Sequence, residues 1–256
     1  NCRDMVDFVT PYDHPDYYAI AFSYQDVKRQ VDFFEEAARR FCKTSVKRFL
    51  EIGCGPSPQL REIARRGYEA VGLDINPNML QYLRQKASDE GVQVETVQAD
   101  MRDFELKTRC DFAFLLSGSL YVNSNDEFLK HLSCVSNALN DDSPYLLENV
   151  LVEFKPYAHE EWTMKRHDIE VKTRFEATLI NAIEQTSQEK LTFEVNDHGR
   201  RKELVSITKM KDFAPQEFKS LIELSGCFKF LGFFKHLSLT PLQQIEKDTI
   251  VLMQKK

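Results

Sequence analysis

The sequence lacks the patterns of several large classes of protein. Its six cysteines form no C-x-x-C pair and have no close histidine spacing, so neither a zinc site nor a dense disulfide framework is expected. Scattered cysteines in mostly apolar surroundings indicate reduced thiols and a cytoplasmic protein. No run approaches the roughly 18 consecutive apolar residues that span a bilayer, and no charged-then-apolar leader precedes residue 20, so we expect no membrane part.

An excess of basic residues is also missing. The 34 Lys and Arg residues stand against 40 Asp and Glu, which gives a formal net charge of −6. This balance argues against a surface that follows phosphates, and we expect no nucleic-acid partner. The chain begins at Asn1 rather than at Met, which indicates that residues before it are missing.

Apolar side chains are abundant enough for a sizeable core. They make up 42% of the 256 residues, and Phe alone occurs 19 times. The length suits one domain with an insertion. We divide the chain into an aromatic and helical cap (1–45), a core (46–150), an inserted sheet (151–211) and a return to the core (212–256).

Short strands alternate with helices from about residue 46, which is typical of βαβ units and a parallel sheet. Ser57-Pro58 and Asn76-Pro77 each place a capping side chain before a proline that suits the first helical position. We predict an α/β, Rossmann-like fold with helices on both faces. Its strands are expected at 46–52, 69–74, 92–98, 110–116 and 144–150, with a helix over Asp126–Leu139.

After residue 150 the pattern changes to alternating, β-branched stretches. Strands are expected at 168–183, 187–196 and 201–211, and the last two are joined by the turn-forming residues 197–200. We interpret 151–211 as an antiparallel β insertion that forms an acceptor lid or a dimer element. A helix over 215–224 and strands at 228–234 and 249–253 complete the chain.

Three strand ends carry residues that suit a nucleoside ligand. Gly53-Cys54-Gly55 follows the first strand, but Pro58 stands where a dinucleotide fingerprint has its third glycine, so close helix–strand packing there is not provided for. Asp74 ends the second strand and can accept from both ribose hydroxyls. Asp100 ends the third and can accept from an adenine amine, with Met79 over one face of the purine.

These residues resemble the class I S-adenosylmethionine-dependent methyltransferases. The resemblance rests on ExGCG at 51–55, LDINPNML at 73–80, QADM at 98–101 and DFAFLLSGSLYV at 111–122. It implies S-adenosylmethionine as the cofactor and a seven-stranded sheet whose last strand is antiparallel. The implied cofactor-binding residues are Tyr18, Glu51, Gly53, Cys54, Gly55, Asp74, Ile75, Met79, Asp100, Met101, Leu116 and Ser117.

The extra segments look like those of the small-molecule members of this class, such as glycine or sugar N-methyltransferases. In those relatives an N-terminal tyrosine often closes the cofactor site, and Tyr17 or Tyr18 could correspond. Packing of the aromatic cap on the core is the competing interpretation of Tyr12, Tyr17, Tyr18, Phe22 and Tyr24. No Asn-Pro-Pro-Tyr-like run follows the fourth strand, so methylation of nucleic-acid bases is not supported.

We therefore expect in-line transfer of a methyl group to a small-molecule acceptor, with no metal and with a general base optional. The acceptor-side candidates are Tyr121, Glu148, Asn149, His167 and Arg174, each of which also has a purely structural interpretation. His131 is expected at the surface, and Cys54 as a small filler. An NAD-dependent oxidoreductase and a non-catalytic cofactor-binding protein remain alternatives, and the chain is expected to be a monomer or a homodimer.

Overall fold

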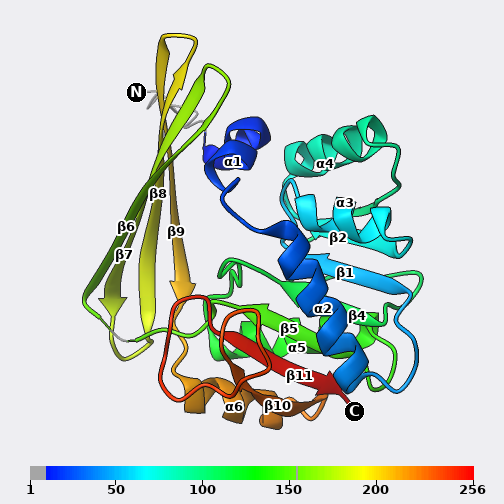
Figure 1. Cartoon of the computed structure of the whole chain (residues 1–256). Helices are drawn as coiled ribbons and strands as arrows, with labels where there is room; N and C mark the ends of the chain where they lie inside the picture. The colour runs from blue at the N-terminus through cyan, green and yellow to red at the C-terminus, as the bar shows by residue number, and fades with distance from the viewer. Residues whose placement is uncertain (1–9, 154) are drawn as a thin grey trace, which may run out of the picture.

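A seven-stranded mixed sheet forms the centre of the computed structural model, which describes residues 10–153 and 155–256 (Figure 1). The strand order is β10-β11-β5-β4-β1-β2-β3. The last strand, β11, runs antiparallel to both of its neighbours, as predicted. The strands are β1 (Arg48–Ile52), β2 (Glu69–Asp74), β3 (Glu95–Gln98), β4 (Phe112–Leu115), β5 (Pro144–Glu148), β10 (Phe228–Phe234) and β11 (Ile250–Lys255).

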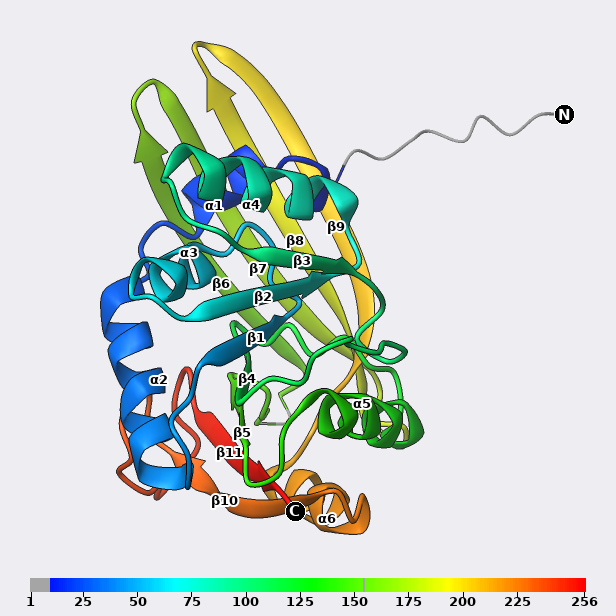
Figure 2. The ribbon, with the colours of Figure 1, turned by 90° about the vertical axis from the view of Figure 1, so that its right-hand side faces the viewer.

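Helices cover both faces of this sheet, each through its apolar side (Figure 2). On one face lie α2 (Val27–Phe41), α3 (Pro58–Arg65) and α4 (Pro77–Asp89), and on the other α5 (Asn125–Ala138) and α6 (Pro215–Leu224). The expected caps are present. The Ser57 hydroxyl accepts from the Leu60 N–H at 2.9 Å, and the Asn76 side chain accepts from the Asn78 N–H at 2.8 Å.

A second, four-stranded antiparallel sheet stands beside the first (Figure 1). Its strands are β6 (Tyr157–Arg166), β7 (Ile169–Asn181), β8 (Thr186–Asp197) and β9 (Arg200–Lys211), in that order across the sheet. The sequence predicted β7, β8 and β9 but not β6 as a separate strand. The reason is that β6 is an edge strand with eight of its ten residues exposed, so it carries little apolar alternation.

The N-terminal segment lies between the two sheets. The short helix η1 (Pro11–Asp13) and α1 (Pro15–Ala21) pack with apolar residues of β7, β8 and β9. The Trp162 indole of β6 donates to the Ala21 carbonyl at 2.8 Å, and the Tyr17 hydroxyl donates to Asp197 at 2.8 Å. These bonds fix α1 against the second sheet and present its other side to the first.

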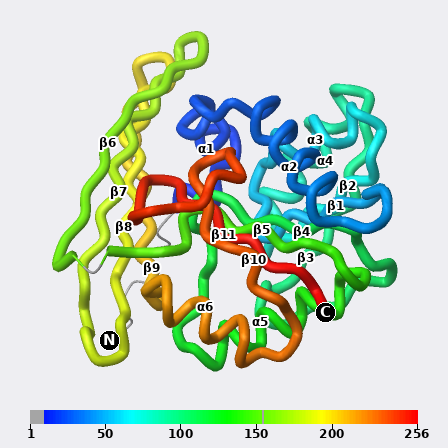
Figure 3. Tube along the Cα trace, turned by 60° about the horizontal axis from the view of Figure 1, so that its bottom comes forward, coloured from blue at the N-terminus to red at the C-terminus, as the bar shows by residue number. Residues whose placement is uncertain are grey.

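The segment between β10 and β11 also reaches the second sheet (Figure 3). Lys247 of that segment pairs with Glu160 of β6 at 2.7 Å. The N-terminal segment and the segment between β10 and β11 therefore both contact the second sheet.

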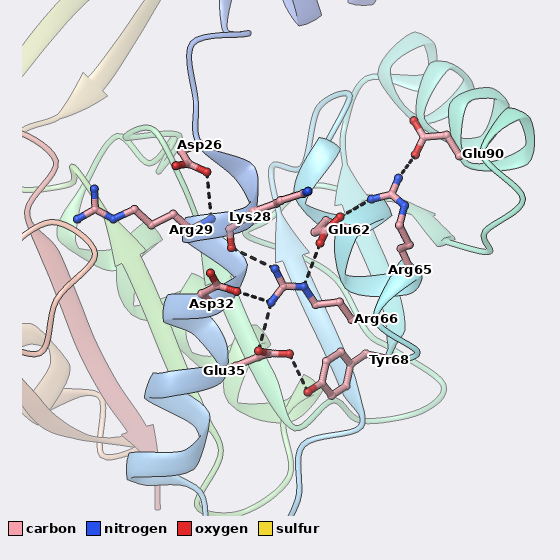
Figure 4. A network of polar contacts seen from close by, with 10 residues as sticks. All are labelled: Asp26, Lys28, Arg29, Asp32, Glu35, Glu62, Arg65, Arg66, Tyr68 and Glu90. Carbon is pink, nitrogen blue, oxygen red and sulfur yellow. Dashed lines mark hydrogen bonds and ion pairs between the residues drawn. The ribbon is translucent and has the colours of Figure 1, made fainter.

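A charged network fastens α2 to the end of α3 (Figure 4). Arg66 pairs with Asp32 at 2.7 Å, with Glu35 at 3.2 Å and with Glu62 at 3.0 Å. Tyr68 donates to the same Glu35 at 3.0 Å. Because α2 follows directly on the segment that contains α1, this network helps to hold the N-terminal segment in place.

Membrane-spanning helices and metal clusters are both absent from residues 10–153 and 155–256. Among these residues, no helix has both the length and the apolar character that crossing a membrane requires. The same residues contain no cluster of three or more His, Cys, Asp or Glu side chains suited to a metal ion. Cys2 lies outside the described residues.

Candidate active site

Three adjoining cavities lie at the carboxyl ends of the parallel strands, the edge where open α/β sheets bind ligands. Tyr18 and Ser119 line all three cavities. We call them the nucleoside cavity, the glycine-loop cavity and the acceptor cavity, the first and last after the ligands that the sequence predicts. In that order, they are lined among others by Asp74 and Asp100, by Gly53 and Gly55, and by Asn149 and Glu189. Tyr18 and Ser119 therefore mark the point at which the three spaces meet.

The nucleoside cavity brings together residues from the ends of β2 and β3. Asp74, Ile75, Met79, Asp100 and Met101 all line it. Met79 is buried, whereas the Ile75 side chain is exposed. The carboxylates and apolar side chains that the sequence analysis selected from separate strand ends thus face one space.

Asp74 is held by backbone donors from two segments. Its carboxylate accepts from the Gly55 N–H at 2.7 Å and from the Asn76 N–H at 2.8 Å. Burial raises the pKa of Asp74, and these backbone hydrogen bonds act in the opposite direction. The carboxylate therefore joins the glycine loop to the start of α4 as well as lining the cavity.

Asp100 is fixed by a residue that the sequence analysis missed. The guanidinium of Arg102 donates to the Asp100 carboxylate from Nε at 2.9 Å and from Nη2 at 2.6 Å. The Arg102 backbone N–H donates to the same carboxylate at 2.8 Å. The hydrogen bonds from Arg102 hold the pKa of Asp100 below its usual range. Arg102 also reaches Glu127 at 3.0 Å. Its position two residues after Asp100 was the available signal.

The glycine loop has the open backbone that a ligand needs for close approach. Gly53 and Gly55 have φ values of 64° and 52°, in the left-handed region. A Cβ at Gly55 would meet no atom within 4 Å, because the position faces the cavities. Gly55 therefore leaves room for a group that a side chain would obstruct.

Close packing between α3 and the sheet beneath the glycine loop depends on Gly72. A dinucleotide fingerprint would instead use a glycine at position 58. A Cβ at Gly72 in β2 would lie 2.8 Å from both the Cys54 sulfur and a Leu60 methyl group. We expected that, with Pro58 in place of a glycine, the helix could not pack closely on the strand. That expectation is wrong, because Gly72 on the neighbouring strand β2 makes the room. Cys54 is buried, and burial raises the pKa of its thiol well above the usual value.

The glycine-loop cavity has a buried carboxyl group and one cationic side chain. Glu51 is 4% exposed and accepts from the Ser57 hydroxyl. Burial raises the pKa of Glu51 to about 8. Arg166, at the end of β6, is the one Lys, Arg or His side chain among the described residues that line this cavity, and it donates to the Ala19 carbonyl at 3.3 Å.

The loop after β4 turns sharply at the junction of the cavities. Ser117 and Gly118 have φ values of 55° and 69°. Their N–H groups donate to the side chain and the carbonyl of Glu148, each at 3.0 Å. Gln25 donates to the Ser117 hydroxyl at 3.1 Å. Leu116 and Ser117 thus line the glycine-loop cavity, and the hydrogen bonds to Glu148 constrain the backbone at Ser117 and Gly118.

Glu148, at the end of β5, is a buried carboxylate rather than a solvated one. Its side chain is 5% exposed, accepts a hydrogen bond from the Ser117 N–H and lies 3.3 Å from the His236 ring nitrogen. It is absent from the lining of the three cavities, whereas Asn149, the next residue, lines the acceptor cavity. The carboxylate therefore supports the loop rather than facing the acceptor space.

Two other acceptor candidates lie away from the cavities. His167 occupies the turn between β6 and β7 with a φ of 52° and is exposed. Arg174 pairs with Glu161 at 3.3 Å and with Glu194 at 3.0 Å across neighbouring strands. Neither side chain lines the acceptor cavity.

The expectation that His131 lies at the surface is wrong. The side chain is fully buried on α5, between the Met101 carbonyl and the Tyr145 hydroxyl, both at 2.9 Å. Burial lowers its pKa to about 4, so the ring is neutral near pH 7. Through its bond to the Met101 carbonyl, His131 helps to hold the backbone next to Asp100.

The N-terminal tyrosines take different roles. Tyr18 lines all three cavities, whereas Tyr17 is 3% exposed and packs against the second sheet. The hydroxyls of Tyr12 and Tyr121 lie 2.9 Å apart, and both side chains line the nucleoside and acceptor cavities. Both interpretations of the aromatic cap thus apply, since some of its members pack and others face the cavities.

Comparison with known proteins agrees with this arrangement. Residues 49–142 match the model of a methyltransferase domain. The matched segment covers 94 of the 256 residues, less than half of the chain. A curated relative from Geobacillus sp. (strain WCH70), named as a putative methyltransferase, is 26% identical over 117 residues, which are 45% of this chain. The match spans 47% of that relative, less than half of its length.

Solved structures of methyltransferases share the fold over nearly the whole chain. An S-adenosylmethionine-dependent methyltransferase from Clostridium acetobutylicum has a TM-score of 0.78 at 14% identity, over 94% of this chain and 96% of that one. An amino pentose methyltransferase from Micromonospora echinaspora has a TM-score of 0.69 at 18% identity, over 93% and 96%. The domain match and these structures agree with the class I methyltransferase fold that the sequence predicts.

A sugar N-methyltransferase from Streptoalloteichus sp. has a TM-score of 0.70 at 15% identity, over 94% of this chain and 92% of that one. The coverage of more than nine tenths on both sides means that the second sheet belongs to the shared fold. The methyltransferase domain model alone, over residues 49–142, does not include it.

Proposed function

We propose that this chain transfers the methyl group of S-adenosylmethionine to a small-molecule acceptor. The observation that carries the proposal is the meeting of three cavities at Tyr18 and Ser119, at the carboxyl ends of the strands of a methyltransferase domain. A methyl donor in the first two cavities places its reacting carbon at that junction, where the third cavity delivers an acceptor. The amino pentose and sugar acceptors named for two structural neighbours support a small molecule.

The cavity linings fit the chemistry of the cofactor. Asp74 and Asp100 offer carboxylate oxygens to a ribose and to an adenine amine, and Met79 and Met101 supply apolar contact for the base. We assign the glycine-loop cavity, lined by Gly53, Gly55, Leu116 and Ser117, to the methionine part of the cofactor. Arg166 offers a positive charge to the carboxylate of that part. Tyr18 covers the junction. When bound, the cofactor supplies an electrophilic methyl group on a cationic sulfur.

The residues of this chain contribute alignment and exclusion of water. Methyl transfer is an in-line displacement in which charge disperses, so correct placement of the two reactants accounts for much of the rate. Tyr12, Tyr18 and Tyr121 close the junction with aromatic rings, and the turn at Ser117 and Gly118 fixes the backbone beside it. No step requires a metal ion.

Calorimetric titration with S-adenosylhomocysteine and, separately, with NADH tests the cofactor assignment. We expect saturable 1:1 binding of S-adenosylhomocysteine and none of NADH at the same concentrations. Binding of NADH alone would favour the oxidoreductase alternative. Release of the methyl group to a pool of amines, alcohols and carboxylic acids then separates an enzyme from a protein that only binds the cofactor.

A further inference from the structure

The acceptor cavity carries more negative than positive side chains. The acidic residues in its lining are Glu160, Glu189, Asp212 and Asp248, and the basic ones are Lys211 and Lys247. Both lysines are already paired. Lys247 binds Glu160 at 2.7 Å, and Lys211 lies 3.2 Å from Glu217, a residue outside the lining, and donates to Gln185 at 2.6 Å. The cavity therefore has more carboxyl than ammonium groups in its lining, which favours a cationic ligand.

Glu189 is the carboxylate in this lining that points to such a ligand most directly. It lies on β8, between Ala177 of β7 and Thr208 of β9, on the same face of the strand as buried Leu191. Among the described residues its side chain has no hydrogen-bond or ion-pair partner, whereas Asp212 accepts from the Ser187 hydroxyl. A carboxylate in this position needs a partner that the protein does not supply.

The charge of Glu189 acts on two tyrosines that line both the nucleoside cavity and the acceptor cavity. Burial raises the pKa of Tyr12 to about 12, and Glu189 contributes to that rise through its charge. Glu189 acts in the same direction on Tyr121, whose hydroxyl lies 2.9 Å from that of Tyr12. Burial raises the pKa of Glu189 itself to about 8, so in the ligand-free protein the group is largely protonated at pH 7, and a bound cation stabilises its carboxylate form.

The remaining walls suit the body of an organic cation. Aromatic side chains from three parts of the chain line the cavity. The N-terminal segment contributes Tyr12, Tyr18, Phe22 and Tyr24, the second sheet contributes Trp162 and Phe175, and the core contributes Tyr121 and Phe213. The faces of such rings attract positive charge, most strongly where water is excluded. A small ammonium compound would therefore find both a carboxylate and aromatic contact in one space.

We propose that the acceptor is a small amine, bound as its ammonium form, and that Glu189 is the catalytic residue that takes the proton from its nitrogen. The inference rests on the methyl transfer proposed above. The ammonium N–H bond breaks and its proton passes to the Glu189 carboxylate. The freed lone pair forms the new N–C bond while the electron pair of the S–C bond returns to sulfur, which gives an N-methylammonium product and S-adenosylhomocysteine. Glu189 then releases the proton to water.

Matched pairs of probes test the class of acceptor on the wild-type chain. Ligand-observed NMR on protein saturated with S-adenosylhomocysteine compares tyramine with 4-(2-hydroxyethyl)phenol and glucosamine with glucose. We expect at least one amine to bind at least tenfold more tightly than its alcohol partner at pH 7. Equal binding within every pair, or no binding by either amine, would overturn the proposal.

Glu189→Gln tests the residue, with Glu194→Gln as the matched control on the opposite face of the same strand. The change at position 189 should reduce the amine-over-alcohol preference at least tenfold and leave the affinity for S-adenosylhomocysteine within twofold. The control should change neither value. A preference that survives in Glu189→Gln contradicts the assignment, and the wild-type comparison decides the acceptor class even if the variant does not fold.

The failure of this inference is distinct from that of the proposed function. Tight binding of S-adenosylhomocysteine without amine preference removes the ammonium acceptor and leaves the cofactor assignment standing. Absence of S-adenosylhomocysteine binding to the wild-type chain removes the proposed function itself.

Discussion

The Asp74 carboxylate accepts a hydrogen bond from the Gly55 N–H at 2.7 Å, across 19 residues of sequence. This contact joins the end of β2 to the loop after β1, so one side chain both lines the nucleoside cavity and fixes the backbone that adjoins it. Loss of the carboxylate therefore affects ligand and loop together.

Asp74→Ala is expected to weaken binding of S-adenosylhomocysteine about 100-fold, since charge-assisted hydrogen bonds contribute about 1.5–3 kcal/mol each. Calorimetry measures the effect. Asp89→Ala, which removes an exposed carboxylate at the end of α4, is the control and should leave the affinity unchanged. An unaltered dissociation constant in Asp74→Ala would show that the ribose assignment is wrong.

A second prediction concerns Arg102, which holds Asp100 through two guanidinium nitrogens. Arg102→Ala frees the Asp100 side chain to rotate, so we expect a loss of about tenfold in affinity for S-adenosylhomocysteine, about 1.4 kcal/mol. Arg84→Ala is the control, because Arg84 bonds to Thr96 outside the three cavities. A loss as large as that of Asp74→Ala would instead indicate direct contact between Arg102 and the ligand.

The strand ends could be predicted from the sequence because each one is a local signal. A β-rich run followed by an acidic residue predicted both Asp74 and Asp100, and serine or asparagine before proline predicted the starts of α3 and α4. Parallel strands that share a sheet edge then bring such residues together. The residues that line the nucleoside cavity were thus accessible from patterns of a few residues each.

The acceptor side was not accessible in this way. Glu189 lies in a strand whose sequence shows only alternation, and its role depends on which neighbours face it from β9 and from the N-terminal segment. His131 was expected at the surface because histidine on an amphipathic helix is often exposed, yet a buried carbonyl and a buried hydroxyl bond to its ring. Contacts between distant segments decide both residues, and local patterns do not encode them.

A third prediction concerns pH and Glu51, whose pKa burial raises to about 8 from a usual value of 4.5. Between these two values the folded protein retains a proton that the unfolded chain has lost. The contribution of Glu51 to the stability of the ligand-free protein is therefore largest below pH 4.5 and declines as the pH rises toward 8. While only the unfolded chain is ionised at this position, the free energy of unfolding falls by about 1.4 kcal/mol for each rise of one in pH.

Glu51→Gln removes this titration and should flatten the decline. Urea denaturation at pH 5, 6.5 and 8 measures the free energy of unfolding for wild type and variant, and the variant should gain most at pH 8. Glu69→Gln, in which the side chain is 65% exposed, is the control and should follow the wild-type curve. Parallel curves for wild type and Glu51→Gln would show that Glu51 is already ionised in the folded protein.

The fourth prediction separates stability from binding through the network of Figure 4, where Arg66 joins α2 to α3. Its side chain is 21% exposed and meets three carboxylates. Arg66→Ala removes the ion pair of Asp32 and leaves Glu35 with its hydrogen bond from Tyr68 and Glu62 with its ion pair to Arg65. We expect the free energy of unfolding to fall by about 1–2 kcal/mol, above the value for an isolated surface pair. Arg65→Ala, with a side chain 51% exposed, should cost about 0.5 kcal/mol.

Binding of S-adenosylhomocysteine should change less than threefold in Arg66→Ala, because none of the side chains that pair with Arg66 lines the three cavities. Urea denaturation and calorimetry on the same preparation measure both quantities. A large loss of affinity with little loss of stability would contradict this division. It would mean that the network holds α2, and with it Tyr18 over the junction of the cavities, in the position that ligand binding requires.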